Sequence, residues 1–175
     1  MLSRQEIEQH LKNPNVRKML GVIASAEGVK HGYNTMFGNE RLSDLSKHPG
    51  ILKEFTQTDG KKNKTSAAGR YQFLEPTWNG LAKQLGLKDF SPKSQDIAAV
   101  ALLAQNGALP HVLKGDIPTA VKKSGGTWAS LPSAPDSYKQ PKKTWSDIGM
   151  SGSTFDRVKG CLLYTSPSPR DVEES

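Results

Sequence analysis

The sequence of 175 residues lacks several features that mark common protein classes. It has one cysteine, which is too few for an internal disulfide framework or for a structural zinc site with two or more cysteine ligands. It has no apolar run of about 18 residues, so we expect no membrane-spanning helix. The N-terminal segment carries Glu6 and Glu8 and lacks the apolar core of a secretory signal peptide. We therefore expect neither stable membrane insertion nor dependence on disulfides.

Negative charge is also scarce relative to positive charge. The sequence has 24 Lys and Arg residues against 17 Asp and Glu, which gives a formal net charge of +7. This balance favours an anionic partner, such as nucleic acid, a lipid surface or an acidic envelope polymer. No predicted helix carries the basic stripe of a DNA-recognition helix, so we expect no nucleic-acid partner. The lysine clusters at 61–64, 122–123 and 142–143 are interpreted as solvated faces.

Helical patterns occupy both ends of the sequence and flank a middle segment that lacks them. We predict helices from capping residues and apolar spacing at 4–12, 13–27, 76–85, 92–106, 109–114 and 117–123, with a buried turn at 128–132 and a marginal helix from 144. Residues 29–69 are rich in glycine and are expected to form an irregular lobe with a small hairpin. Its strand candidates are 33–37 and 51–57, followed by a basic loop at 60–65. This order predicts a mainly α-helical α+β fold.

Glu27 lies on the apolar face of the predicted helix 13–27. That face is formed by Val16, Met19, Leu20 and Ile23. Burial and the negative end of the helix dipole would both raise the pKa of Glu27, which suits a general acid. An ordinary solvated glutamate at a helix end is the alternative, and the pattern alone favours that simpler interpretation.

The segment from Ser66 to Gln72 joins the irregular lobe to the later helices. Its small residues allow a ligand to approach closely, and its amide and phenol groups can bind and stack on sugars. A tight turn followed by a core aromatic residue is an equally good interpretation. The histidines have no pair at i, i+4 and are interpreted as surface residues: His10, His31, His48 and His111. We therefore predict no metal site.

Several segments resemble the phage lambda endolysin family and occur in the same order as in that family. They include residues 25–28 (Ser-Ala-Glu-Gly), 31–33 (His-Gly-Tyr), 68–72 (Ala-Gly-Arg-Tyr-Gln), the long match over 83–96, and 128–132 (Trp-Ala-Ser-Leu-Pro). The resemblance covers about residues 16–132. It implies a lysozyme-like fold with a glycan cleft between two lobes.

The same resemblance implies a soluble lytic transglycosylase that needs no cofactor. Glu27 would cleave the β-1,4 bond between N-acetylmuramic acid and N-acetylglucosamine in peptidoglycan, and the product would be a 1,6-anhydro sugar. The residues expected to line the glycan cleft are Tyr33, Ser66, Arg70, Tyr71 and Gln72. The partner would be peptidoglycan glycan strands, bound by a monomer.

A second carboxylate would decide between transglycosylation and hydrolysis. Asn34 stands where the family resemblance leads us to expect an acid, which favours chemistry with one carboxylate. Asp44 and Asp59 remain in the irregular lobe, so a hydrolytic lysozyme (muramidase) is the alternative. A cationic cell-wall-binding module without enzyme activity is the third hypothesis.

The domain prediction treats residues 1–160 as one lysozyme-like catalytic domain, with residues 1–14 as a helical N-terminal extension. Residues 161–171 resemble the in-frame translation of a transposase adapter used in sequencing libraries. We therefore interpret residues 161–175 as a non-native tail. The family resemblance implies accumulation in the host cytoplasm and release through a holin pore at lysis.

Overall fold

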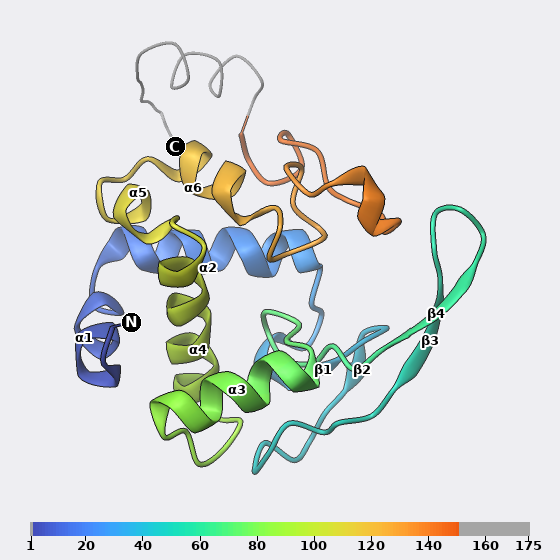
Figure 1. Ribbon diagram of the computed structural model, residues 1–175, viewed down its shortest axis with the longest axis horizontal. Coiled ribbons are helices and arrows are strands. Elements are labelled where there is room, and N and C mark those ends of the chain that lie inside the picture. The colour runs from blue at the N-terminus through green and yellow to red at the C-terminus, as the bar shows by residue number, and fades with distance from the viewer. Residues whose placement is uncertain (1, 151–175) are drawn as a thin grey trace.

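The computed structural model describes residues 2–150, so the predicted tail at 161–175 lies outside the described residues. The helices gather on one side of the molecule and two short strand pairs lie on the other (Figure 1). Within residues 2–150, no helix has both the length and the apolar character needed to cross a membrane.

The first two helices begin at the caps predicted from the sequence. Helix α1 (Arg4–His10) starts with a capping box, in which Glu6 N donates to Ser3 Oγ at 3.1 Å and Ser3 N donates to Glu6 Oε1 at 2.9 Å. Helix α2 (Pro14–Glu27) is capped by Asn13, whose Oδ1 accepts a hydrogen bond from Asn15 N at 2.8 Å. Ile7 is fully buried and α1 packs against α4 (Pro92–Gln105), so the predicted extension is part of the core.

The later helices enclose the core around α4. They are α3 (Glu75–Leu85), α5 (Leu109–Leu113) and α6 (Ile117–Ser124). Helix α4 contacts α2, α3 and α5, and nearly every side chain from Ile97 to Leu103 is buried, so α4 is central to the core. Figure 1 shows α4 running at a steep angle beneath α2.

No helix begins at Thr144 within the described residues, so the prediction of a last helix is wrong. A short 3-10 turn, η2 (Asp136–Tyr138), precedes this region, and residues 145–149 form successive turns. Ile148 and Met150 are nevertheless buried in the common core. These two buried side chains hold the segment in place together with the turn hydrogen bonds from Gly149 N to Ser146 O at 3.0 Å and from Met150 N to Trp145 O at 2.8 Å.

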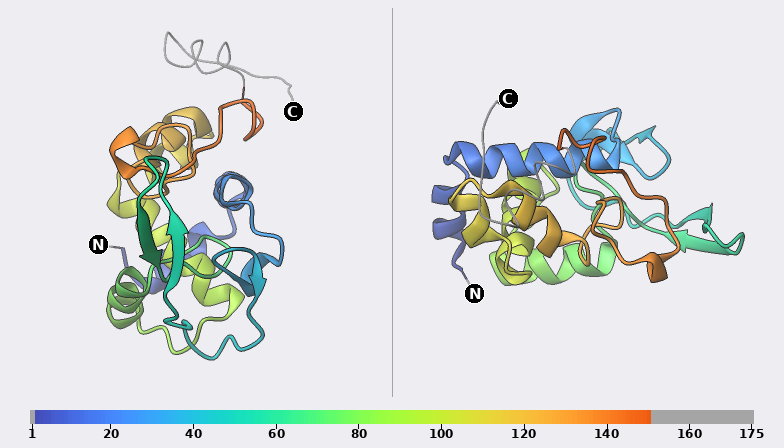
Figure 2. Two further views of the ribbon diagram at one scale, coloured as in Figure 1. Left: turned by 90° about the vertical axis from the view of Figure 1, so that its right-hand side faces the viewer. Right: turned by 90° about the horizontal axis from the view of Figure 1, so that it is seen from above.

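The irregular lobe contains two strand pairs where the sequence predicted one small hairpin. Strand β1 (Thr35–Met36) pairs antiparallel with β2 (Glu40–Arg41), and β3 (Lys53–Thr56) pairs with β4 (Lys62–Thr65). The predicted basic loop is therefore in large part strand β4. The sequence did not reveal this strand, because three of its four residues are exposed and its polar side chains show no alternation of apolar and polar residues. The β3–β4 hairpin projects away from the helices (Figures 1 and 2).

Candidate active site

Glu27 is the last residue of α2, where the apolar face of the helix reaches the surface. The residues that precede it on this face are all buried: Val16, Met19, Leu20 and Ile23. Gly28 ends the helix at a φ of 67°, and its N–H donates to Ala24 O at 3.0 Å. Glycine adopts this left-handed conformation without strain and turns the chain away from the helix. Glu27 therefore lies at the edge of the core and keeps partial exposure to solvent.

Burial raises the pKa of Glu27 to about 7, from an ordinary value of 4.5. Loss of hydration is the largest cause, because it disfavours the charged carboxylate. A hydrogen bond with the Ser130 side chain and the positive charge of Lys143 both lower the pKa and limit the rise. The sequence pattern alone favoured an ordinary solvated glutamate, and the upward shift instead agrees with the alternative of a buried acid. A carboxyl group with a pKa near 7 holds a proton at neutral pH and can also release it.

The two groups that act on Glu27 come from the segment that follows α6. Trp128 is buried, and its Nε1 donates to Tyr71 O at 3.0 Å. Leu131 is fully buried, so the predicted buried turn is confirmed. These anchors hold Ser130 next to the end of α2.

Sequence reasoning missed both Ser130 and Lys143. Lys143 belongs to a cluster that was interpreted as solvated, and much of its side chain is indeed exposed. Its Nζ nevertheless donates to Ala26 O at 2.9 Å, across 117 residues of sequence. No local pattern predicts a contact at that separation. The resemblance did cover Ser130, but only as part of the segment 128–132, and it gave this serine no role.

Three of the predicted glycan-binding residues gather around the buried carboxylate of Asp96. The hydroxyls of Tyr33 and Tyr71 donate to Asp96 at 2.9 Å and 2.6 Å, and Arg17 NH1 donates to it at 2.8 Å. Arg70 donates to the Tyr71 hydroxyl at 2.6 Å and lies over both tyrosine rings. The structure thus joins Tyr33, Tyr71 and Arg70 in one hydrogen-bonded cluster.

The prediction that Tyr71 lines a glycan cleft needs correction. Its side chain is fully buried, and burial raises the pKa of its hydroxyl far above the ordinary range. Tyr71 is therefore the core aromatic residue of the alternative interpretation, and its hydroxyl orients Asp96. Tyr33 and Arg70 are only partly buried and remain available to a ligand.

Ser66 also proves to be a buried structural residue. Its Oγ accepts a hydrogen bond from Glu75 N at 2.9 Å and so caps the first turn of α3. Gln72 has a φ of 52°, and its Nε2 donates to Gly69 O at 2.8 Å. A Cβ on Gly69 would lie 2.5 Å from the Gln95 side-chain oxygen. This segment is thus a tight turn. Ser66 and Gly69 are buried, and Gln72 is partly exposed to solvent.

His48 is buried, which contradicts its interpretation as a surface residue. Its Nδ1 accepts from Gly50 N at 3.0 Å, and its Nε2 lies 2.8 Å from Phe73 O. The ring is then neutral with a proton on Nε2, and burial lowers its pKa. His48 fixes the loop that leads to β3. Within residues 2–150, no cluster of three or more His, Cys, Asp or Glu side chains could hold a metal ion.

The two remaining carboxylates of the irregular lobe have local hydrogen-bonding roles. Asp44 accepts from Ser46 N at 2.9 Å, and its hydrogen bonds with Ser46 lower the Asp44 pKa. Asp59 lies at the tip of the β3–β4 hairpin and accepts from Lys61 N at 3.0 Å. Both contacts are typical of aspartate in turns.

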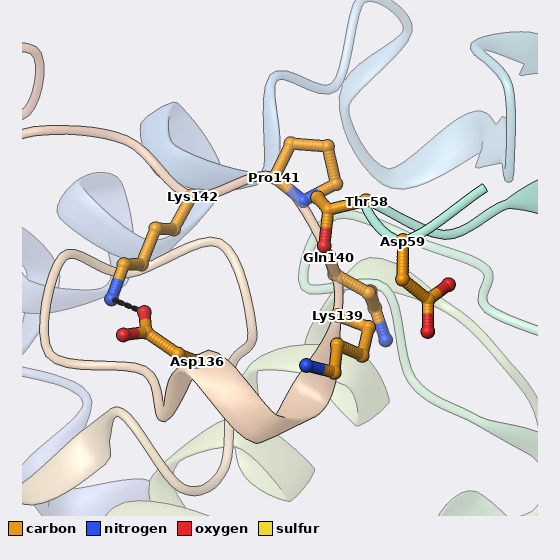
Figure 3. A pocket seen from close by; sticks show the side chains of 7 residues that line it. All are labelled: Thr58, Asp59, Asp136, Lys139, Gln140, Pro141 and Lys142. Carbon is orange, nitrogen blue, oxygen red and sulfur yellow. Dashed lines mark hydrogen bonds and ion pairs between the residues drawn. The ribbon is translucent and has the colours of Figure 1, made fainter.

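A pocket of about 450 Å³ separates the hairpin tip from the segment around η2 (Figure 3). Its lining residues are Thr58, Asp59, Asp136, Lys139, Gln140, Pro141 and Lys142. Thr58 N donates to Lys139 O at 2.9 Å, so the irregular lobe and the last described segment are joined beside it. Glu27 is not among the residues that line this pocket.

Comparison with known proteins identifies the family. The Endolysin family model matches residues 17–154. The chain is 43% identical over 129 residues to the endolysin of Escherichia phage lambda, covering 69% of this chain and 79% of that protein. It is 34% identical over 133 residues to the endolysin of Escherichia phage P2, covering 69% and 81%. The chain belongs to the phage endolysin family.

Solved structures place this endolysin among lysozyme-like folds. It resembles the lysozyme from bacteriophage lambda with a TM-score of 0.62 and 39% identity, over 69% of this chain and 80% of that chain. It resembles the lambda lysozyme complexed with a chitohexasaccharide with a TM-score of 0.67 and 39% identity, over 86% and 97%. The predicted lysozyme-like α+β fold is confirmed.

Proposed function

We propose that this endolysin cleaves the β-1,4 bond between N-acetylmuramic acid and N-acetylglucosamine by lytic transglycosylation, with Glu27 as its acid. Membership of the endolysin family supports action on peptidoglycan. The related lambda lysozyme forms a complex with a chitohexasaccharide, which supports a glycan substrate. Access to the cell wall would follow release through a holin pore.

The proposed reaction uses one carboxyl group twice. Glu27 first donates its proton to the bridging oxygen, and the bond from that oxygen to C1 of the muramic acid breaks. The C6 hydroxyl of the same sugar then bonds to C1 and returns its proton to the Glu27 carboxylate. The products are a free 4-hydroxyl on N-acetylglucosamine and a 1,6-anhydro ring, with no water consumed. A pKa of about 7 suits both proton transfers near neutral pH.

The observation that carries this proposal is the set of charges around Glu27. A protein nucleophile in a retaining glycosidase lies about 5–5.5 Å from the acid, and its negative charge would raise the pKa of that acid. Among the described residues, the charge that acts on Glu27 is the positive charge of Lys143. Asn34, which replaces the expected acid, donates to Leu42 O at 2.8 Å. These contacts favour chemistry with a single acid.

Mass spectrometry of digested peptidoglycan tests the proposal directly. We expect wild-type digests to carry 1,6-anhydromuramic acid ends and to incorporate no oxygen from ¹⁸O-labelled water. Reducing muramic acid ends that carry ¹⁸O would instead establish the hydrolytic muramidase.

Variants of the three carboxylates provide the matched controls. Glu27→Gln should lower lytic activity by several orders of magnitude while binding to cell walls survives. Asp44→Asn and Asp59→Asn should each keep activity within a few-fold of wild type. Full activity in Glu27→Gln would refute the assignment, and loss of lysis in either aspartate variant would point to a second acid.

A further inference from the structure

The end of α2 lacks a basic residue of its own. The last turn of the helix contains none, although the last backbone carbonyls of any helix lack intrahelical partners and attract positive charge. Lys143 supplies this charge from a distant part of the chain, because its Nζ donates to Ala26 O at 2.9 Å. The ammonium group therefore lies at the residue that directly precedes Glu27.

Lys143 is fixed at its backbone as well as at its tip. Its N–H donates to Ser130 O at 2.8 Å, so Ser130 and Lys143, the two residues that act on Glu27, are hydrogen-bonded to each other. The ammonium also lies beside the residue that ends the helix, since a Cβ built on Gly28 would be 3.9 Å from Lys143 Nζ, an ordinary contact distance. The helix end, the serine and the lysine thus form one connected unit around the carboxyl group.

The neighbouring lysine shows that this arrangement is specific to Lys143. Lys142 Nζ lies 2.9 Å from both Asp136 Oδ1 and Ala134 O. Lys143 forms no ion pair among the described residues, although Asp147 lies within its electrostatic reach. The Asp147 carboxylate is held mainly by hydrogen bonds with Thr144, which leaves the Lys143 ammonium directed at the helix end.

We propose that Lys143 is a positioning residue for the general acid, which clamps the last turn of α2 and stabilises the Glu27 carboxylate between its two proton transfers. This inference rests on the proposed function of Glu27. Without the lysine, the same buried carboxyl would hold its proton more tightly and donate it less readily to the leaving oxygen. The charge of Lys143 thus balances the desolvation that makes Glu27 an acid.

The first test measures the carboxyl group itself and needs no activity. A ¹³C NMR titration of glutamate carboxyl groups, with Glu27→Gln to assign the resonance, gives the Glu27 pKa in each variant. We expect Lys143→Met to raise this pKa by roughly half a unit, because a partly solvated cation is lost. Lys143→Arg should keep the wild-type value, since it retains the charge. Lys142→Met is the matched control and should leave the titration unchanged.

The second test measures kcat against pH on soluble peptidoglycan fragments. In Lys143→Met the alkaline limb should move to higher pH by the same amount, while kcat at neutral pH falls several-fold and KM changes little. The proposal would be overturned if folded Lys143→Met kept the wild-type Glu27 pKa and the wild-type alkaline limb of the kcat–pH profile. An equal shift in Lys142→Met would also overturn it. Glu27→Gln with full activity would refute the proposed function instead, so the two failures are distinguishable.

Discussion

At the scale of single residues, Glu27 combines two requirements that oppose each other. An acid must be buried to hold its proton at neutral pH, but burial of a carboxyl group opposes the ionised folded state. The sequence places Glu27 on an apolar helix face, because that spacing follows from residues within one helix, but it left a buried acid and a solvated glutamate open as alternatives. Ser130 and Lys143, which limit the shift, escape prediction because they arrive from the far end of the chain.

This opposition has a measurable effect on stability. The Glu27 pKa is about 7 in the folded protein against an ordinary 4.5, so the folded state binds more protons than the unfolded state between these values. Stability conferred by the neutral carboxyl is therefore lost as pH rises from 4.5 to 7. We expect Glu27→Gln to raise the free energy of unfolding at pH 8 by about 2–3 kcal/mol, and to have little effect at pH 4. Urea denaturation of both proteins across this range checks the prediction; a difference that is constant with pH contradicts it.

At the scale of elements, most helices and two strands were predictable. Strands β1 and β3 lie within the predicted strand candidates at 33–37 and 51–57, whereas β2 and β4 were missed. Ser3, Asn13 and Ser91 each mark a helix start through contacts within three residues, so the sequence alone locates them. Strand β4 has three exposed residues out of four and no apolar alternation, and its basic residues therefore suggested a loop. Burial within the turn at Ser66 and Tyr71 depends on α3 and α4, which a local pattern does not reveal.

Two glycines with opposite surroundings test this account of the elements. Gly69 has a φ of 86° and a Cβ there would meet both Gln95 and Phe90, whereas Gly80 lies in α3 with nothing within 4 Å of an added Cβ. We expect Gly69→Ala to lower stability by roughly 2–4 kcal/mol through backbone strain and overpacking. Gly80→Ala should raise stability by up to about 1 kcal/mol, because alanine favours the helix. Thermal unfolding of both variants measures the difference, and a stable Gly69→Ala would show that the turn is not constrained.

At the scale of the whole molecule, one hydrophobic core joins the ends of the described chain. Ile7 in α1 and Ile148 near the last described residue belong to the same cluster. The segment that carries Lys143 is thus held by burial on one side and by the turn at Trp128 on the other. The proposed general acid, Glu27, depends on this closure, since neither Ser130 nor Lys143 lies in α2.

The net charge of +7 is also a property of the whole molecule, and it predicts salt-dependent binding. We expect the affinity of Glu27→Gln for anionic peptidoglycan sacculi to fall roughly tenfold between 20 and 200 mM NaCl, because salt screens long-range attraction. Affinity for an uncharged chitohexasaccharide should change less than about twofold over the same range. Sedimentation with sacculi and calorimetry with the oligosaccharide measure the two; equal salt dependence would show that net charge does not drive binding.

The hydrogen bond between Lys143 and Ala26 spans 117 residues, and this distance has a consequence for the order of synthesis. A ribosome completes α2 early, but it adds Lys143 only after every helix described within residues 2–150 has been made. Chains grow at about 5–20 residues per second, so several seconds separate the two events. For most of that interval the nascent Glu27 has neither its serine nor its lysine partner. The proposed catalytic acid therefore gains both partners only after Ser130 and Lys143 have been added to the growing polypeptide.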